Sequence, residues 1–349
     1  MGTTEDKSPA TVFQARSKKQ KWAEERGAVG IIELFQLPTN FWGIATNYFS
    51  RPRIELKPSE AKGASNFIYG WIQEGETELS KTIKTGKKNK VNLVTNSSIT
   101  KSVASNNVIG VIEGSDPVLK NEYVLLSAHY DHVGTGKNGG GAFTPQDSIF
   151  NGTRDNAFGT VALLSAAKAL AKQTPKRSII ILAVTGEELG LLGSNFYANH
   201  PIFPLEQTIY NLNTDGAGYN ATNIITLIGL GRTGADAEIE KAAKLFGLAV
   251  NADPAPEQGL FDRSDNVSFA AKGVPAPTFS PGFTAFDENI MKYYHQVTDN
   301  PESIDFDYLL KFCQSFSHAA RLIADKAERP FWTSGDKYEA VGKQLYGKK

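Results

Sequence analysis

The segment SIIILAVT, residues 178–185, constrains the fold of this chain more than any other feature of its sequence. Every position from Ile179 to Val184 is apolar, and the run is bounded by Arg177 on one side and Gly186 on the other. A strand that is apolar on both faces is typical of a parallel sheet covered by helices on each side. The run therefore predicts a buried strand in the middle of an α/β domain.

The sequence around this run alternates between strand-like and helix-like stretches. Strands are expected at 107–114, 122–128, 178–185, 208–214 and 224–229, and helices at 156–173 and 234–248. In the first of these helices, the spacing predicts that Val161, Leu164, Ala167 and Leu170 share one face. This order predicts a mostly parallel, twisted sheet flanked by helices, with ligands bound just beyond the carboxyl ends of the strands.

The first hundred residues have a different character. Residues 1–10 are polar and expected to be disordered, and residues 11–27 are charged and helix-like, with Gly27 as the C-terminal cap. Further strands are expected at 29–35, 66–72 and 90–96. We therefore expect a smaller β-rich lid region at 11–98, a main domain at 99–327 and a C-terminal extension at 328–349.

Composition excludes several classes of protein. The 349 residues carry 37 Lys and Arg against 37 Asp and Glu, so the net charge of zero argues against a nucleic-acid partner held through phosphates. Cys313 is the only cysteine, which excludes an internal disulfide and a cysteine zinc cluster. No apolar run is long enough to span a membrane, and the polar start predicts no signal peptide.

We nonetheless expect an exported protein, periplasmic or secreted, whose signal is absent from this sequence, with a cytoplasmic location as the alternative. The oligomeric state is not indicated.

Histidines and carboxylates recur where the expected strands end or helices begin. These residues are His129, Asp131, Asp155, Glu187, Glu188, Asp215, His295 and Asp299. Singly, each has an ordinary explanation as a helix cap, a turn or a core histidine. Together they favour a site for zinc or a related divalent ion. They are too many for one tetrahedral ion, so we expect two ions bridged by a carboxylate, with His129 as a ligand and Asp131 orienting a ligand.

Several segments resemble the M28 zinc peptidases, the co-catalytic aminopeptidase family. They are SAHYDHVG at 127–134, NGTRDNAFGTVALL at 151–164, EELGLLGS at 187–194, NTDGAG at 213–218 and YYHQVTD at 293–299. RSDNVSF at 263–269 resembles the RSDH segment of that family, with Asn266 in place of the usual histidine. The resemblance covers roughly residues 105–325 and implies the zinc-exopeptidase, phosphorylase/hydrolase-like fold. Residues 14–34 resemble the helix and strand of a protease-associated (PA) domain, in an incomplete form.

The resemblance also implies roles for individual residues. One zinc would be held by His129, Asp155 and Asp215, and a second by Asp155, Glu188 and His295. Glu187 would be the general base for a metal-activated water. Asp131 matches an acidic residue behind a ligand histidine, and Tyr294 matches a tyrosine that helps to polarise the scissile carbonyl. Arg263 and Asp265 are candidates for substrate contacts, and Asn266 puts those contacts in question rather than the metal ligands.

The expected substrate is a peptide, and the expected activity is that of an aminopeptidase. Six acidic groups against the four positive charges of two zinc ions leave negative potential for a free α-amine. A carboxypeptidase or dipeptidase of the same superfamily is the alternative, because Arg154, Arg232 or Arg263 would suit a terminal carboxylate. A glutaminyl cyclase and a non-catalytic receptor-like domain are less favoured, since His129 and the other ligands implied by the resemblance are all present.

Overall fold

The computed structural model describes residues 9–35, 54–57, 67–73 and 101–347, together with the single residues Trp42, Thr46, Lys90, Asn92 and Val94. The chain divides into two compact units, Met1–Ser102 and Val103–Lys349. The division falls close to the boundary expected after residue 98.

The first unit contains one helix and a two-stranded parallel sheet. Helix α1 spans Pro9–Glu24, strand β1 spans Gly30–Phe35 and strand β2 spans Ile68–Gln73. Because α1 already begins at Pro9, the last two residues of the segment expected to be disordered are helical, and its residues 1–8 lie outside the described part. The carboxylate of Glu33 accepts hydrogen bonds from Lys19 of α1 (2.5 Å) and from the Trp71 indole of β2 (2.8 Å), and so ties the three elements together.

Two expectations for this unit stay predictions. Of the strand expected at 90–96, the structure describes only Lys90, Asn92 and Val94, none of which is in a strand. The likeness to a PA domain and the role as a lid are not tested by the described elements.

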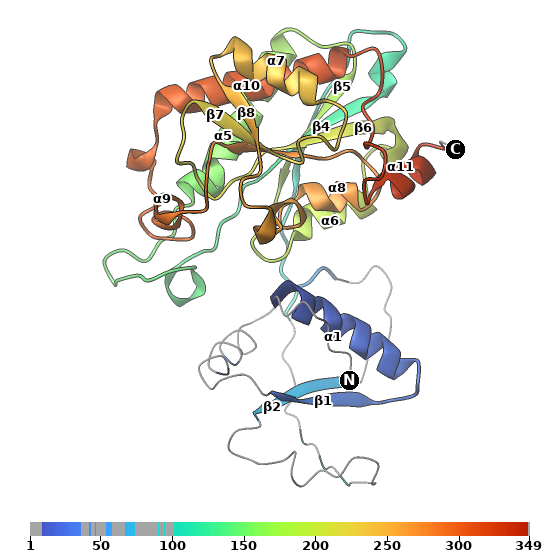
Figure 1. The fold of residues 1–349 in the computed structure, drawn as a ribbon, viewed down its shortest axis with the longest axis vertical. Coiled ribbons are helices and arrows are strands. Elements are labelled where there is room, and N and C mark those ends of the chain that lie inside the picture. Colours follow the sequence, from blue (N-terminus) through green and yellow to red (C-terminus); the bar gives the residue numbers. More distant parts are fainter. Residues whose placement is uncertain are drawn as a thin grey trace. The chain divides into compact units, whose positions relative to one another are not determined.

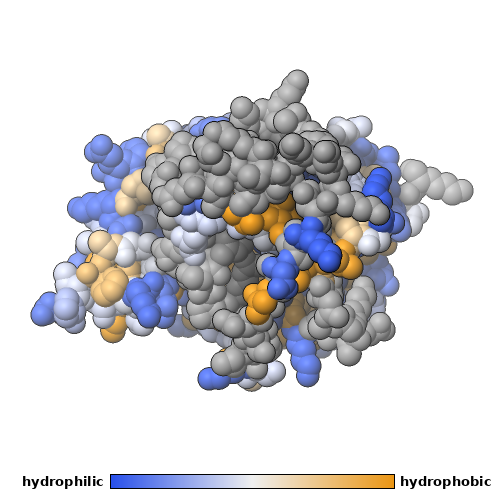
Figure 2. All heavy atoms as spheres, turned by 90° about the horizontal axis from the view of Figure 1, so that it is seen from below, coloured by the Kyte–Doolittle hydropathy of each residue, from blue (hydrophilic) through white to orange (hydrophobic). Residues whose placement is uncertain are grey.

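Hydrophobic side chains lie at the protein surface in a central group on the face drawn in Figure 2, beside hydrophilic ones. In the two-stranded sheet, Ile32 and Ile68 are 42% and 40% exposed.

The second unit is built on a seven-stranded mixed sheet. Its strands are β3 (Val108–Ile112), β4 (Tyr123–His129), β5 (Ser178–Val184), β6 (Thr208–Asn213), β7 (Ile224–Ile228), β8 (Ala249–Ala252) and β9 (Thr278–Pro281). They lie in the order β3-β5-β4-β6-β9-β7-β8, and only the pairs β3–β5 and β7–β9 are antiparallel. The prediction of a mostly parallel sheet is confirmed, and β5, the apolar run, lies between β3 and β4 in its interior.

Helices cover both faces of this sheet (Figure 1). One face carries α5 (Phe158–Lys172), α7 (Asp236–Leu245) and α10 (Phe306–Asp325). The other carries α6 (Leu192–Asn199), α8 (Asn266–Ala270) and α11 (Glu339–Leu345). A short helix, α9, spans Glu288–Met291, and a turn with non-helical backbone at Asp155 and Asn156 spans Thr153–Ala157. Single 3-10 turns lie at Leu119–Asn121, Gly136–Asn138, Leu205–Gln207, Pro256–Gln258, Leu260–Asp262 and Pro301–Ser303. Each face has its own apolar core, so the sheet is buried on both sides.

The buried face of α5 differs from the expected one. Val161 and Leu164 are 42% and 60% exposed, whereas the buried residues are Phe158, Gly159, Ala162, Leu163, Ala166 and Leu170. The reason is that α5 packs against the sheet and α10 together, with the ring of Phe158 5.0 Å from that of Phe312. This second contact turns the helix so that part of its apolar surface faces solvent.

The C-terminal stretch packs on the second unit as part of its core. Trp332 is 3% exposed, and its indole donates a hydrogen bond to the carbonyl of Gly273 (2.8 Å). The Tyr346 hydroxyl donates to the carbonyl of Thr208, at the start of β6 (2.6 Å). Residues 328–347, expected as a C-terminal extension, therefore pack on this unit. Within the described residues, no helix combines the length and the apolar character that a bilayer span requires.

Candidate metal centre

The carboxyl ends of three neighbouring parallel strands bring the expected site residues together. His129 is the last residue of β4, Glu187 and Glu188 follow β5, and Asp215 follows β6. Because β5, β4 and β6 are adjacent and parallel, their ends meet at one edge of the sheet. This is where an α/β sheet builds its ligand sites.

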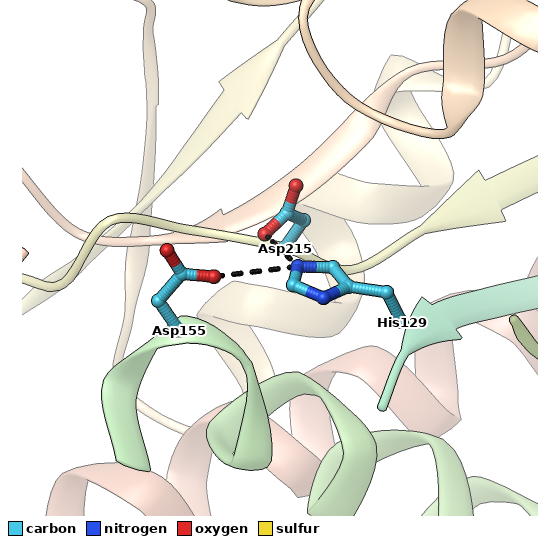
Figure 3. Close-up of side chains that lie close together, drawn as sticks. All are labelled: His129, Asp155 and Asp215. Atoms are coloured by element: carbon cyan, nitrogen blue, oxygen red, sulfur yellow. Dashed lines mark hydrogen bonds and ion pairs between the residues drawn. The ribbon is translucent and has the colours of Figure 1, made fainter. Parts of the chain in front are cut away.

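A first group consists of His129 and two carboxylates beside its imidazole. Nε2 of His129 lies 3.1 Å from Oδ1 of Asp215 and 3.3 Å from Oδ1 of Asp155. Figure 3 shows both carboxylates turned toward this nitrogen. Asp155 comes from the turn before α5, and Asp215 from the loop after β6. The imidazole is almost fully buried, so the three groups form a polar cluster in the protein interior.

A second group lies on the other side of Asp155. Nε2 of His295 is 3.2 Å from Oδ2 of Asp155 and 3.2 Å from Oε2 of Glu188. Asp155 thus turns one oxygen to each group. His295 has a positive φ of 55°, and the ring of Tyr294 stacks on it with the centroids 4.0 Å apart.

The donor atoms of each group fit zinc. Zinc bonds to histidine nitrogen and carboxylate oxygen at about 2.0–2.2 Å in a tetrahedron, so ligand atoms on one ion lie roughly 3.3–3.5 Å apart. The separations of 3.1–3.3 Å in the two groups are close to this spacing. Imidazole and carboxylate donors also match the preferences of zinc.

His132 is a functional candidate that the sequence reasoning did not assign. Its Nδ1 lies 3.0 Å from Oε1 of Glu188, and it forms a possible metal-binding group with Asp155 and Glu188. Its signal was present in the segment SAHYDHVG as a second histidine three positions after His129. The path of the loop at residues 130–152 decides which of its side chains point toward the metal centre. No periodicity in the sequence predicts that path.

Asp131, which is expected to orient a ligand, also contacts the backbone that follows β5. Its carboxylate accepts hydrogen bonds from the backbone N–H groups of Glu187 (3.2 Å) and Glu188 (3.3 Å). The His129 ring contacts it mainly through the Asp131 carbonyl, 3.1 Å from Nδ1, while the carboxylate is 3.8 Å away. Asp131 therefore orients the ring of His129 and the backbone of both glutamates.

Asp299 and Arg154 hold the turn that carries Asp155. The buried carboxylate of Asp299 accepts from the N–H of Arg154 (2.9 Å) and of Asp155 (3.4 Å). The guanidinium of Arg154 lies between the rings of Tyr219 and Tyr293, 4.3 and 3.9 Å from their centroids. Arg154 is 6% exposed and engaged in these contacts, so it is not placed to clamp a substrate carboxylate.

The surroundings shift the protonation of the central groups. Burial, with the nearby charge of Asp215, raises the pKa of Glu187 to about 10. Burial opposes a charge on His295, but the carboxylates of Asp155 and Glu188 outweigh it and raise its pKa to about 9. Burial and the carboxylate of Asp155 also raise the pKa of the Tyr294 hydroxyl. The metal-free centre therefore holds protons where a bound cation would favour their loss.

A cavity opens directly over the two groups. The acidic part of its lining consists of Asp155, Glu187, Glu188 and Asp215. The apolar part of its lining consists of Ile228, Leu260, Phe283, Phe286 and Ile290. Tyr294, His295 and Arg263 also line it, and the side chain of Arg263 is exposed. A ligand in this cavity would meet carboxylates on one side and hydrocarbon on the other.

The RSDN segment supplies different residues to the cavity from those expected. Asp265 is fully buried and is not among the lining residues, so it is not positioned to touch a substrate; burial raises its pKa to about 7. Ser264 lines the cavity instead and donates to Oδ2 of Asp215 (2.5 Å). Asn266 is also buried and donates to the carbonyls of Phe261 and Ala276, so its role is to join two loops.

Fold and site together define a class: an α/β protein with a paired histidine–carboxylate centre, suited to divalent metal, beneath a cavity at the carboxyl ends of its strands. The model of peptidase family M28 matches residues 107–320, more than half of the chain. The chain therefore belongs to this family of metallopeptidases, and the resemblance noted in the sequence is confirmed.

Individual proteins with similar sequences include proteases. The chain is 36% identical over 117 residues to a vacuolar membrane protease of Saccharomyces cerevisiae (strain YJM789). The matched stretch covers 34% of this chain and 10% of that protein. A vacuolar membrane protease of Tuber melanosporum is 31% identical over 157 residues, covering 42% and 14%. The chain thus spans only about a tenth of the length of the first of these curated relatives.

Among solved structures, BSAP, a zinc aminopeptidase from Bacillus subtilis, is similar with a TM-score of 0.50 and 24% identity. The match covers 67% of this chain and 52% of that one. This likeness supports the α/β fold, which agrees with the predicted fold class.

Proposed function

We propose that this protein is a two-zinc aminopeptidase. The observation that carries the proposal is the pairing of two histidine–carboxylate groups through one shared carboxylate, Asp155, on the floor of a cavity. In this proposal, His129, Asp155 and Asp215 hold one zinc ion, and Asp155, Glu188 and His295 hold the other. When bound, such ions polarise a carbonyl and lower the pKa of water.

Glu187 is the proposed general base. Its carboxyl group lines the cavity but is not in either group of ligand atoms, and Asp131 holds its backbone in place. It takes the proton of the attacking water and returns it to the leaving amine. Burial and the charge of Asp215 raise the pKa of Glu187, and the charge of bound cations would favour its ionised form.

Two further residues are proposed to contact the substrate. The Tyr294 hydroxyl, on the cavity wall beside His295, donates a hydrogen bond to the oxyanion that develops on the scissile carbonyl. Arg263, which is exposed at the cavity, contacts the peptide on the carboxyl side of the cleaved bond. The four carboxylates of the lining favour a free α-amine, which is a cation.

The apolar wall supports a preference for an apolar residue at the amino terminus of the substrate. Ile228, Leu260, Phe283, Phe286 and Ile290 offer hydrocarbon and no opposite charge to a lysine or glutamate side chain. A buried leucine or phenylalanine side chain gains about 1.5–3 kcal/mol from such contacts. We therefore expect leucine or phenylalanine p-nitroanilide to be cleaved faster than the lysine or glutamate derivative.

One specific observation favours a second candidate, a carboxypeptidase or dipeptidase. Arg263 lines the cavity, and within the described residues it makes no ion pair, so its guanidinium is free to take a terminal carboxylate. Rates on leucyl-phenylalanine amide and on N-acetyl-leucyl-phenylalanine distinguish the candidates, because the first has a free α-amine and no carboxylate and the second has a free carboxylate and no amine. The aminopeptidase proposal expects cleavage of the first only. Cleavage of the second only would overturn it in favour of a carboxypeptidase, and cleavage of unblocked leucyl-phenylalanine alone would favour a dipeptidase.

A further inference from the structure

The contact between His132 and Glu188 has the spacing of a metal site but not the geometry of a hydrogen bond. Nδ1 of His132 and Oε1 of Glu188 are 3.0 Å apart, and both side chains are more than nine-tenths buried. Neither atom has a hydrogen-bond partner, and Nε2 of His132 has none either. Buried polar atoms without a partner are costly, so an atom that satisfies both at once is expected between them.

A cation is the partner that fits both atoms. A carboxylate oxygen only accepts hydrogen bonds, whereas an imidazole nitrogen and a carboxylate oxygen both ligate zinc. Asp155 completes the group, since one ligand atom from each of His132, Asp155 and Glu188 lies within 4.8 Å of the others. The separation of 3.0 Å is close to those of the other candidate pairs in the centre.

The local backbone makes room for this histidine. Gly152 has a positive φ of 65°, and a Cβ atom built on it would lie 2.5 Å from Cγ of His132 and 2.6 Å from the carbonyl oxygen of Asp155. A larger residue at 152 would therefore push the imidazole away from Glu188. The rings of His132 and His295 meet edge to face, with centroids 5.5 Å apart, on the same side of the centre.

We propose that His132 is an additional ligand of the metal ion that Glu188 holds, an inference that rests on the proposed function. The two positions then differ. In this proposal the ion at Glu188 has His132 on the side of Oε1 and His295 on the side of Oε2, with Asp155 as the fourth ligand, while the other position has His129, Asp155 and Asp215. Four protein ligands close a zinc site, whereas three leave a coordination position open. The ion at Glu188 is retained more tightly, and the ion at Asp215 keeps the open position.

The test measures zinc affinity by chelator competition on the full chain, for the wild type and for His132→Ala and His132→Gln. Glutamine can donate a hydrogen bond to Glu188 but is a poor zinc ligand, so it separates ligation from orientation. His200→Gln is the matched control, because His200 is an exposed histidine at the end of α6. Far-UV circular dichroism of each metal-free variant shows whether it is folded, and glutamine preserves volume if alanine impairs folding.

We expect both His132 variants to bind zinc more weakly than the wild type at the tighter of the two sites. The loss of affinity should exceed the roughly 10–100-fold that is typical of a group that only orients a ligand. The visible spectrum of the cobalt-loaded protein should change with them, and His200→Gln should match the wild type. Wild-type affinity in His132→Gln with weaker binding in His132→Ala would overturn ligation, since orientation alone would then explain the residue. Wild-type affinity in both would leave His132 without a role. A wild-type chain that binds no zinc would instead overturn the proposed function, and this inference with it.

Discussion

Glu187 and Glu188 are neighbours in the sequence, yet their side chains have different partners. Glu188 faces His132 and His295, whereas Glu187 faces the cavity near the charge of Asp215. Both backbone N–H groups bond to Asp131, so the pair is held as one rigid unit. This difference between adjacent carboxylates allows one to be assigned to metal binding and the other to proton transfer.

The roles of the pair are separable by substitution. Glu187→Gln removes the base but no ligand, so we expect kcat to fall by about 10²–10⁴-fold with zinc content unchanged. Glu188→Gln should lower zinc content, with activity recovering in part when zinc is added in excess. Activity on leucine p-nitroanilide and bound zinc, measured together, check both. Exchanged behaviour of the two variants would contradict the assignment.

The protonation of the centre predicts how metal-free protein responds to pH. The pKa of His295 is about 9 in the fold against an ordinary 6.5, and that of Glu187 is about 10 against 4.5. Both are raised on folding, so their contribution to stability is full below the ordinary pKa and is lost as pH rises through the folded one. We expect the melting temperature of the metal-free chain to fall between pH 6.5 and 9.

Zinc should reverse this trend, because binding needs the same groups to lose their protons. The gain in melting temperature on adding zinc should therefore grow over the same pH interval. Calorimetric scans with and without zinc give both slopes. A metal-free chain that becomes more stable from pH 6.5 to 9 would show that these groups are not protonated in the fold.

At the scale of elements, a hydrogen-bond chain connects strand β4 to the loop after β6. Ser127 donates to Oδ1 of Asn213 (2.8 Å), and Nδ2 of Asn213 donates to Ser264 (2.8 Å). Ser264 has one proton and gives it to Asp215, which can only accept. Because of this order of donors, Oδ2 of Asp215 accepts the hydrogen bond from Ser264, and Oδ1 of Asp215 faces His129.

Asn213→Asp should break this order, since a carboxylate cannot donate to Ser264. We expect a loss of about 1–3 kcal/mol in unfolding free energy and weaker zinc binding, measured by denaturant titration and chelator competition. Tyr210→Phe is the control, because it removes another buried hydrogen bond of β6, to Thr233, away from the centre. A folded Asn213→Asp variant with wild-type zinc affinity would show that the chain does not position Asp215.

Periodicity predicted the elements better than it predicted their packing. The apolar run of β5 and the strands beside it were found because a strand buried on both faces leaves a simple signature. The face of α5 was misplaced because α10, more than 130 residues later in the chain, takes part of its surface. Trp332 and its neighbours show no period, and their burial depends on a contact with Gly273.

The sequence predicted those site residues that directly follow a strand. His129, Glu187, Glu188 and Asp215 follow strands whose carboxyl ends had to meet. His132 and Asp265 lie in loops and turns, where no periodicity predicts the direction of a side chain: His132 lies beside Glu188, and Asp265 is buried and does not line the cavity.

At the scale of the whole molecule, the centre and its supporting core lie within one unit. The candidate ligands and the cavity lining lie between residues 129 and 295, inside Val103–Lys349. Both apolar cores of the sheet also belong to this unit. A chain of residues 103–349 should therefore fold cooperatively and bind zinc as the full chain does, as calorimetry and zinc titration can establish. A truncated chain that folds but has lost its zinc sites would place part of the centre in the first unit.

Anomalous diffraction from crystals of the zinc-loaded chain can locate the proposed pair of metal ions around Asp155. We expect two peaks about 3.5–4 Å apart. One should lie within bonding distance of His129 and Asp215, the other within bonding distance of Glu188 and His295, with Asp155 contacting both. A single peak, or two peaks whose ligands come from other residues, would show that Asp155 does not bridge two ions.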